Sequence, residues 1–168
     1  MAVLPQLEIL YLARNHIGDG GLAAIAESLA HSTMWQLVLT ENRVGDAGLK
    51  ALATAVGKDN SAFSALRWLF LDQNPITDDG VEALCLALGV GLKNVERLAL
   101  HKCELTNAGL AHLAKAIDGG ALPKCEYLYV QENGFDREGR QILKAAAKPR
   151  NIKVHFGWPP PLPGVEYD

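Results

Sequence analysis

Five segments of the chain share one pattern, in which a polar turn residue is followed six residues later by a glycine. The first position reads Asn15, Asn42, Asn74, Cys103 and Asn133, and the glycines are Gly21, Gly48, Gly80, Gly109 and Gly139. The copies are separated by 27, 32, 29 and 30 residues. Self-similarity at such a period is typical of a chain built from stacked copies of one supersecondary unit. The fold must therefore be a row of repeats.

Each copy has the sequence features of a strand, a turn and a helix. Leu10 and Leu12 show the alternation that recurs before each turn residue, which predicts a short strand with one buried face. The turn residue's amide can bond the backbone of the bend. Apolar residues then recur at helical spacing. Polar residues offer N-cap oxygens for a helix start in four copies: Asp19, Asp46, Asp78 and Asn107.

This pattern resembles the leucine-rich repeat family, in its ribonuclease-inhibitor-like subclass. The resemblance implies an α/β fold: a right-handed β/α solenoid with parallel strands on a concave face and helices on a convex face. We expect one domain over residues 1–156, with units starting near residues 7, 34, 66, 95 and 125 and a terminal strand at 151–156. Leu and Ala make up about 29% of the chain, which fits strands and helices of this kind.

The two ends of the sequence differ from the repeats. Residues 157–168 are proline-rich, with four prolines between 159 and 163. This segment is predicted either to cap the last unit through Trp158 or to act as a ligand for a WW-type domain, since it contains Pro-Pro-Leu-Pro. Only six residues precede Leu7, so no polar unit caps the first strand. That edge suggests self-association or a fragment of a larger sensor or inhibitor array.

Aromatic residues gather in the strand positions predicted to face away from the helices. Trp68, Arg97 and Tyr127 occupy one column, where lateral neighbours can form cation–π contacts. Aromatic residues and arginine dominate binding hot spots, so an exposed row of them predicts a partner site on the concave face. The residues predicted to contact a partner are Tyr11, Trp35, Trp68, Phe70, Arg97, His101, Tyr127 and Tyr129.

Charges near these columns indicate the class of partner. Six acidic residues stand against four basic ones, whereas a phosphate backbone requires the opposite balance. The predicted partner is therefore a protein or peptide, with no nucleic acid. Asp72 and His101 share a column on adjacent strands, which predicts either a pH-responsive pair or, as the preferred interpretation, a solvated polar rim.

Known catalytic motifs are absent from the sequence, so we expect no enzyme activity, cofactor or metal site. Cys85, Cys103 and Cys125 fall at helix, turn and strand positions, which favours structural roles over nucleophilic ones. An odd number of cysteines, no secretion signal and no long apolar run predict a cytoplasmic protein without a membrane partner. The alternative enzyme-like interpretation is a GTPase-activating protein of the Ran type, acting through turn residues such as Arg14, Asn15 or Asn42.

Overall fold

Strands and helices alternate in the computed structural model, which describes residues 6–29 and 31–157. The strands of this part are β1 (Ile9–Tyr11), β2 (Gln36–Val38), β3 (Trp68–Phe70), β4 (Arg97–Ala99), β5 (Tyr127–Tyr129) and β6 (Lys153–His155). The helices are α1 (Asp19–Leu29), α2 (Asp46–Lys58), α3 (Asp78–Val90), α4 (Asn107–Asp118) and α5 (Arg137–Ala147), followed by the 3-10 helix η1 (Lys148–Arg150).

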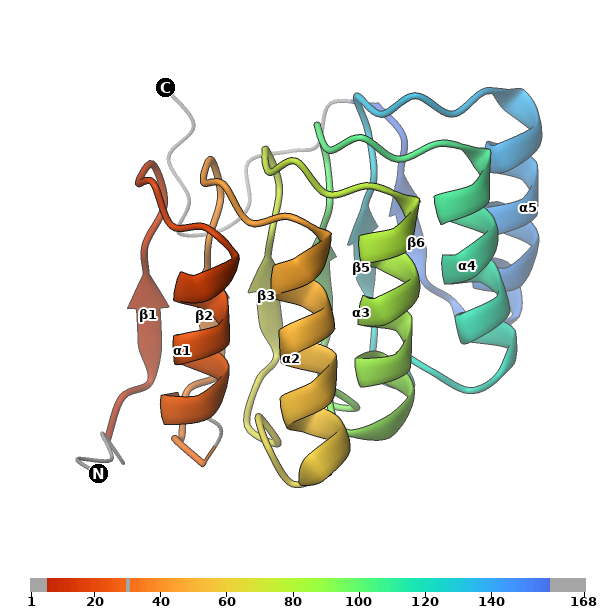
Figure 1. The fold of residues 1–168 in the computed structure, drawn as a ribbon. Helices are drawn as coiled ribbons and strands as arrows, with labels where there is room; N and C mark the ends of the chain where they lie inside the picture. The colour runs from red at the N-terminus through yellow and green to blue at the C-terminus, as the bar shows by residue number, and fades with distance from the viewer. Residues whose placement is uncertain (1–5, 30, 158–168) are drawn as a thin grey trace.

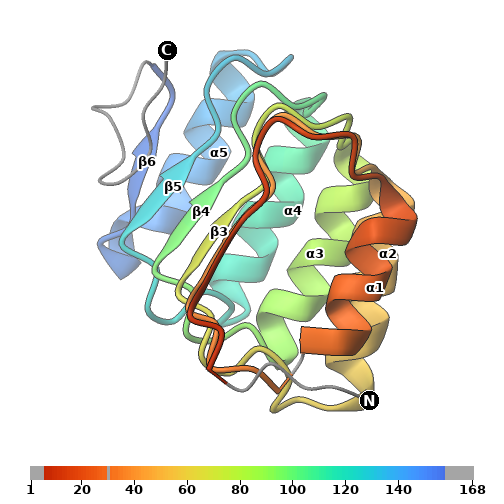
Figure 2. The same ribbon diagram turned by 90° about the vertical axis from the view of Figure 1, so that its left-hand side faces the viewer.

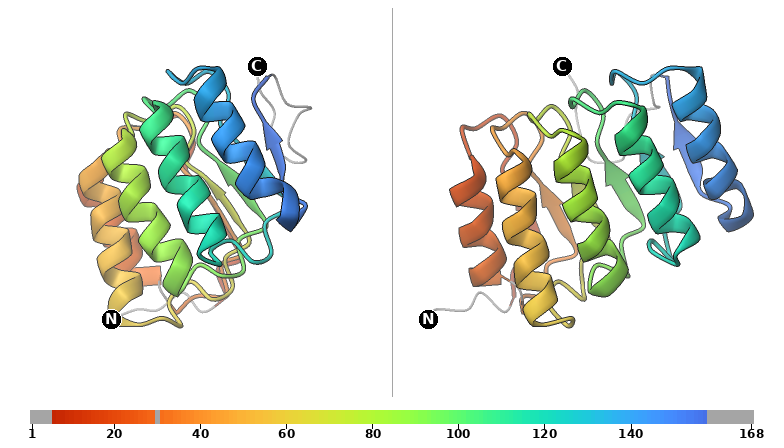
Figure 3. Two further views of the ribbon diagram at one scale, coloured as in Figure 1. Left: turned by 90° about the vertical axis from the view of Figure 1, so that its right-hand side faces the viewer. Right: turned by 45° about the vertical axis from the view of Figure 1, so that its right-hand side comes forward.

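The strands form one parallel sheet in which chain order is also spatial order, from β1 to β6. Each strand pairs with the next, so successive units stand side by side (Figure 1). The five α-helices of the described residues lie on one side of the sheet (Figure 2). They form a row of their own that runs alongside the row of strands (Figure 3). The predicted alternation of parallel strands with helices is confirmed.

The core lies between the sheet and the helices. The central leucine of each inner strand points into it, and Leu37, Leu69, Leu98 and Leu128 are at most 1% exposed. Leu49, Leu84 and Leu110 meet them from helices α2, α3 and α4. Burying one such side chain contributes about 1.5–3 kcal/mol. Because a single unit has only one apolar side, this burial requires a neighbouring unit on the sheet and on the helix row.

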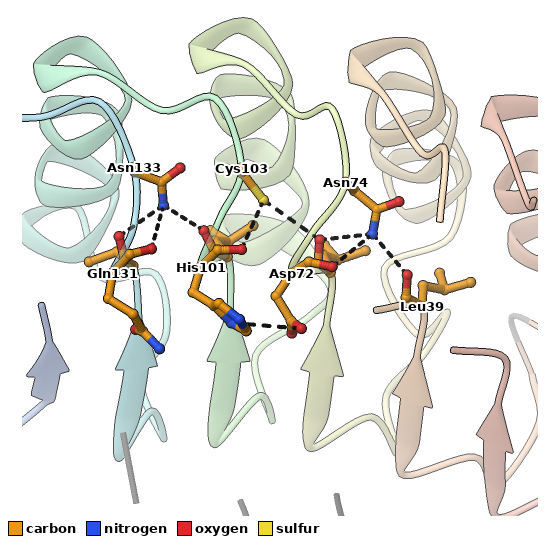
Figure 4. A network of polar contacts seen from close by, with 10 residues as sticks. Leu39, Asp72, Asn74, His101, Cys103, Gln131 and Asn133 are labelled. Atoms are coloured by element: carbon orange, nitrogen blue, oxygen red, sulfur yellow. Dashed lines mark hydrogen bonds and ion pairs between the residues drawn. The ribbon is translucent and has the colours of Figure 1, made fainter. Parts of the chain in front are cut away.

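The turn residues form a hydrogen-bonded row at the ends of the strands (Figure 4). Asn74 donates from Nδ2 to the carbonyl of Leu39 in the preceding unit and to those of Leu71 and Asp72 in its own. Its Oδ1 accepts from the amide of Val44. Asn42 and Asn133 repeat this arrangement, whereas Asn15 bonds only carbonyls of its own turn. Each inner asparagine thus links its unit to the one before it.

Cys103 replaces asparagine with a thiol, which can donate but carries no amide oxygen. Its Sγ lies 3.7 Å from the carbonyls of Leu71 and His101, in the place of the asparagine Nδ2. The amide of Ile76, which corresponds to Val44, bonds the carbonyl of Asn74 instead. The thiol therefore keeps the contacts to the carbonyl groups but not the bond that an asparagine Oδ1 accepts from the preceding unit.

A second row of hydrogen bonds joins the helix starts in the opposite direction. Asp78 begins α3, yet its carboxylate accepts from the amides of Thr106 and Gly109 and from the Thr106 hydroxyl, at the start of α4. Asp19 and Asp46 do the same for α2 and α3, and Asn107 does it for α5. These polar residues thus bond the start of the helix that follows their own, in addition to the local N-caps Thr77, Thr106 and Asp136 of α3, α4 and α5.

These bonds between units explain the glycine six residues after the turn residue. A Cβ at Gly80 would collide with the carboxylate of Asp46, and one at Gly109 with that of Asp78. A Cβ at Gly48 would lie 2.8 Å from Oδ1 of Asp19. The glycine therefore leaves room for the carboxylate that belongs to the preceding unit.

Candidate protein interface

The sheet surface that faces away from the helices is called the strand face below, and it consists of two columns of side chains. Strand pairing places Gln36, Trp68, Arg97, Tyr127 and Lys153 in one column. The other column contains Tyr11, Val38, Phe70, Ala99, Tyr129 and His155. The predicted lateral order of the first five strands is confirmed.

Arg97 lies between two aromatic rings of the first column. Its guanidinium carbon is 4.3 Å from the ring centroid of Trp68 and 5.3 Å from that of Tyr127. Trp35 meets Trp68 edge-on, with centroids 5.1 Å apart. These four half-buried side chains, Trp35, Trp68, Arg97 and Tyr127, are called the aromatic rim below. The rim thus combines large rigid rings with one cation.

A hollow of about 480 Å³ opens beside the two tryptophans of the rim, at the edge where the strands begin. Arg67, Glu96 and Lys124 line its polar side. Such a combination of aromatic surface and a few charges suits an anchoring side chain of a protein partner. The contact residues predicted from the sequence included Trp35 and Trp68. They did not include Arg67, Glu96 and Lys124, because these residues precede the strands and lie outside the two columns.

The second column is buried, which corrects the expectation of an exposed row. Phe70 is 1% exposed and Tyr129 is 4% exposed, whereas Tyr11 at the edge is 52% exposed. Phe70 and Tyr129 form an apolar cluster with Val38 and Ala99, called the apolar floor below. Burial raises the pKa of Tyr129 above its ordinary value, and nearby Arg97 partly opposes that shift. Phe70 and Tyr129 thus belong to the interior of the strand face.

Asp72 and His101 are also buried, so the solvated-rim interpretation is wrong. Asp72 is 0% exposed and His101 is 8% exposed, and His101 Nδ1 lies 3.7 Å from Asp72 Oδ2 (Figure 4). Gln131, which is also buried, lies on the other side of His101, just beyond the strand ends. Burial raises the pKa of Asp72, and the attraction of His101 opposes that rise. The pair is a buried polar contact on the strand face.

Several buried polar atoms of the strand face have no hydrogen-bond partner. Among the described residues, the buried side-chain atoms of this kind are both carboxylate oxygens of Asp72, Arg97 Nη1, Gln131 Oε1 and His155 Nε2. All four side chains belong to β3–β6 or directly follow those strands. Buried polar groups are normally paired, and an unpaired one costs about 1–3 kcal/mol. These atoms are therefore concentrated on one side of the sheet, the strand face.

Comparisons with known proteins agree with this architecture. A family profile described as leucine-rich repeat matches residues 4–26, 31–53 and 67–85. The solved structure of leiomodin-1 actin-binding site 2 superimposes with a TM-score of 0.69 at 19% identity, covering 88% of this chain and 82% of that one. The fold is a leucine-rich-repeat solenoid.

A second solved structure has the same solenoid in a longer form. An internalin from Listeria monocytogenes superimposes with a TM-score of 0.54 at 18% identity, and the match covers 88% of this chain but 34% of the internalin. The comparison with curated proteins found no match. These findings support the leucine-rich repeat family, and the ribonuclease-inhibitor-like subclass stays a prediction.

The solenoid keeps its thiols protonated at neutral pH. Burial raises the pKa of Cys85, Cys103 and Cys125 to about 12 in each case, and none of them is in a disulfide. Among residues 6–29 and 31–157, no three His, Cys, Asp or Glu side chains are grouped to hold a metal ion. No helix in the same ranges is both long and apolar enough to cross a membrane.

The turn residues considered for a GTPase-activating role already have structural partners. Asn42 bonds four backbone groups through its amide, and Arg14 pairs with Glu41 at 3.1 Å. Asn15 donates to two carbonyls of its own turn. The geometry gives these side chains a role in the solenoid itself.

The sixth strand adds two site residues that the sequence prediction missed. His155 stacks on Tyr129 with ring centroids 4.8 Å apart, and the Nζ of Lys153 is 4.9 Å from the ring centroid of Tyr127. Burial lowers the pKa of His155, with Lys153 adding to that effect. The alternation in residues 151–156 contained this signal, because a sixth strand in the same register extends both columns.

Proposed function

We propose that this protein is a non-catalytic interaction module that binds a protein or peptide partner through the strand face. The observation that carries this proposal is the group of buried polar atoms without a hydrogen-bond partner on that face, next to the aromatic rim. A partner's backbone and side chains would supply the missing hydrogen bonds, while Trp68 and Tyr127 would supply contact area. A solved repeat structure of similar size, titled as an actin-binding site, supports a protein as the class of partner.

Other features of the same proposal rest on the sequence. We place the protein in the cytoplasm, which agrees with three unpaired cysteines. A role as part of a larger ribonuclease-inhibitor-like array, as sensor or inhibitor, stays a prediction. So does self-association through the β1 edge, where Ile9 is 47% exposed.

The test compares partner capture by rim variants and by a variant on the helix side. We expect Trp68→Ala and Tyr127→Ala to weaken binding of a captured protein at least tenfold, because each removes a ring at the centre of the surface. Leu86→Ala is the matched control, since Leu86 is 66% exposed on α3. Capture from a lysate of the source cells identifies the protein, and calorimetric titration measures its affinity.

Circular dichroism of each variant checks that it is folded. If both rim variants bind the captured protein as tightly as the control variant does, the strand face is not the interface.

A further inference from the structure

Basic residues gather at one end of the described array, in α5, η1 and β6, which are blue in Figure 3. Residues 137–153 contain six basic residues and one acidic residue, although the whole chain has a formal net charge of -3. Residues 1–136 contain ten basic and sixteen acidic residues. The positive charge is therefore confined to this end of the sheet and of the helix row.

Two of these cations stand where the other units have apolar or small side chains. Arg140 directly follows Gly139, and the residues at this position in the first four units are buried: Leu22, Leu49, Val81 and Leu110. Lys144 corresponds in the same way to Ala26, Ala53, Cys85 and Ala114. Both cations are exposed. Solubility of an end unit requires polar side chains, and a mixture of both charge signs meets that need. The uniform sign is therefore not explained by solubility alone.

Arg140, Lys144, Lys148 and Lys153 form one continuous surface, called the basic end below. The guanidinium carbon of Arg140 and the Nζ of Lys144 lie 5.9 and 5.3 Å from the ring centroid of Phe156. Lys144, Lys148 and Lys153 line a hollow of about 520 Å³. Lys144 belongs to both groups of contacts and so joins them into a single patch.

The cations of the basic end have no negative partner to offset their repulsion. Arg140, Lys144 and Lys148 follow one another at intervals of four residues, a spacing at which like charges destabilise a helix. Within the part of the chain that the structure describes, no carboxylate forms an ion pair with any of them or with Lys153. The helix dipole favours cations in the last turn of α5, but Arg140 lies in the first turn. Carboxylates of a partner would offset the repulsion.

The hollow of the basic end also has an apolar lining, formed by Ala147, Ile152 and Val154. A nucleic acid backbone brings phosphates, which match cations but not an apolar lining. A peptide brings carboxylates and apolar side chains together. The combination of lysines with an apolar lining therefore favours a peptide over a nucleic acid.

We propose that the basic end is a second interaction surface, which binds an acidic segment of a protein. Carboxylates of this segment pair with the four cations, and one of its apolar side chains enters the hollow. The surface goes beyond the proposed function, because it does not use the aromatic rim. The proline-rich residues 158–168, predicted to cap the last unit or to act as a ligand, lie outside the described part of the chain.

Fluorescence anisotropy of a labelled peptide, titrated with the full chain, tests the proposal. The peptide consists of glutamate and leucine residues, and the control peptide has glutamine in place of each glutamate. We expect the glutamine peptide to bind at least tenfold more weakly, because it keeps the apolar side chains and lacks the charges. Added salt should weaken binding of the acidic peptide, since it screens exposed charges.

Variants of the chain locate the binding surface. Lys144→Glu and Lys148→Glu each place a carboxylate in the basic end, so each should weaken binding of the acidic peptide at least tenfold. Lys58→Glu is the matched control, because Lys58 is an exposed lysine in the last turn of α2. This variant should keep the affinity of the original chain. Circular dichroism checks that each variant is folded.

Four outcomes overturn the proposal. The acidic peptide does not bind, or the two peptides bind equally well, so that no carboxylate is recognised. The variants Lys144→Glu and Lys148→Glu keep the original affinity, which places the peptide elsewhere. A single-stranded oligonucleotide binds more tightly than the acidic peptide, which makes a nucleic acid the class of partner.

Trp68→Ala separates this surface from the strand face. We expect this rim variant to bind the acidic peptide as tightly as the original chain does, even where it loses the protein captured through the rim. If Trp68→Ala loses the acidic peptide while Lys144→Glu keeps it, the peptide binds the strand face and the basic end is not a site. If the rim variants keep the captured protein but the lysine variants lose the acidic peptide, the proposed function fails and the basic end stands.

Discussion

Gly80 and Gly89 lie in the same helix, α3, but in different surroundings. A Cβ at Gly80 meets the Asp46 carboxylate, which is held by the amide and hydroxyl of Thr77, whereas a Cβ at Gly89 meets nothing within 4 Å. We expect Gly80→Ala to lower the free energy of unfolding by about 1 kcal/mol or more, since displacing the carboxylate outweighs the helix propensity gained.

Gly89→Ala is the matched control and should raise the free energy of unfolding by about 0.5–1 kcal/mol. Urea denaturation measures both variants. A gain in stability for Gly80→Ala would show that the carboxylate moves aside freely and that the cap contributes little.

The buried carboxyl of Asp72 makes stability depend on pH. Burial raises its pKa in the folded state, although the attraction of His101 opposes the rise. The folded protein then holds this proton more tightly than the unfolded chain, whose aspartate has a pKa of about 3.9. Raising the pH above that value therefore costs stability until the folded-state pKa is passed.

Asp72→Asn removes this cost because the amide does not titrate. We expect the variant to gain stability relative to the original chain as the pH rises from 4 towards 7. Urea denaturation across this range measures the difference. A variant that instead becomes relatively weaker with rising pH would mean that the charged pair with His101 outweighs the burial.

Among the elements, the turns carry the link from each unit to the one before. Asn74→Ala leaves the amide of Val44 and the carbonyl of Leu39 unpaired in a buried site. Each such group costs about 1–3 kcal/mol, so we expect a loss of about 3 kcal/mol or more. Asn15→Ala is the control, because its exposed amide bonds only its own turn and water can replace it. Its loss should stay below about 1 kcal/mol.

Thermal unfolding followed by circular dichroism measures both asparagine variants. Equal losses at the two positions would show that the bonds between units add nothing beyond the local turn.

The elements themselves could be predicted from the sequence, but the hydrogen bonds that join one helix start to the next could not. Alternating apolar residues and the 3.6-residue period locate the six strands and five α-helices of the described residues, but not the 3-10 helix η1. The N-cap of α4 is Thr106, which lies next to the helix as short-range rules require. The amides of Thr106 and Gly109 also bond Asp78, 28 residues before Thr106, and those rules do not reach that far. The glycine that recurs six residues after each turn residue was a sequence signal of these bonds between units. A glycine conserved in every copy indicates that another group occupies the place of a Cβ.

For the whole molecule, the sequence predicts the columns of the strand face but not its burial. Side chains alternate along a strand, so the sequence places Phe70 and Tyr129 on the opposite side of the sheet from the leucines. This alternation does not predict how exposed either side is. The same limit applies to Asp72, whose polarity suggested a solvated position. The burial depends on how side chains of neighbouring strands pack on one another, as Val38, Phe70, Ala99 and Tyr129 do in the apolar floor.

The two rows of hydrogen bonds join each inner unit to both of its neighbours. An inner asparagine donates a hydrogen bond to the unit before it. The aspartate at the helix start accepts hydrogen bonds from the unit after it. These hydrogen bonds are nearly the same between every pair of neighbouring units. Duplicating or removing a whole unit would therefore leave a donor and an acceptor matched at the new junction, whereas a deletion within a unit would leave one of them without its partner. The array can therefore lengthen or shorten in steps of about 30 residues while the width of its strand face changes by one strand at a time.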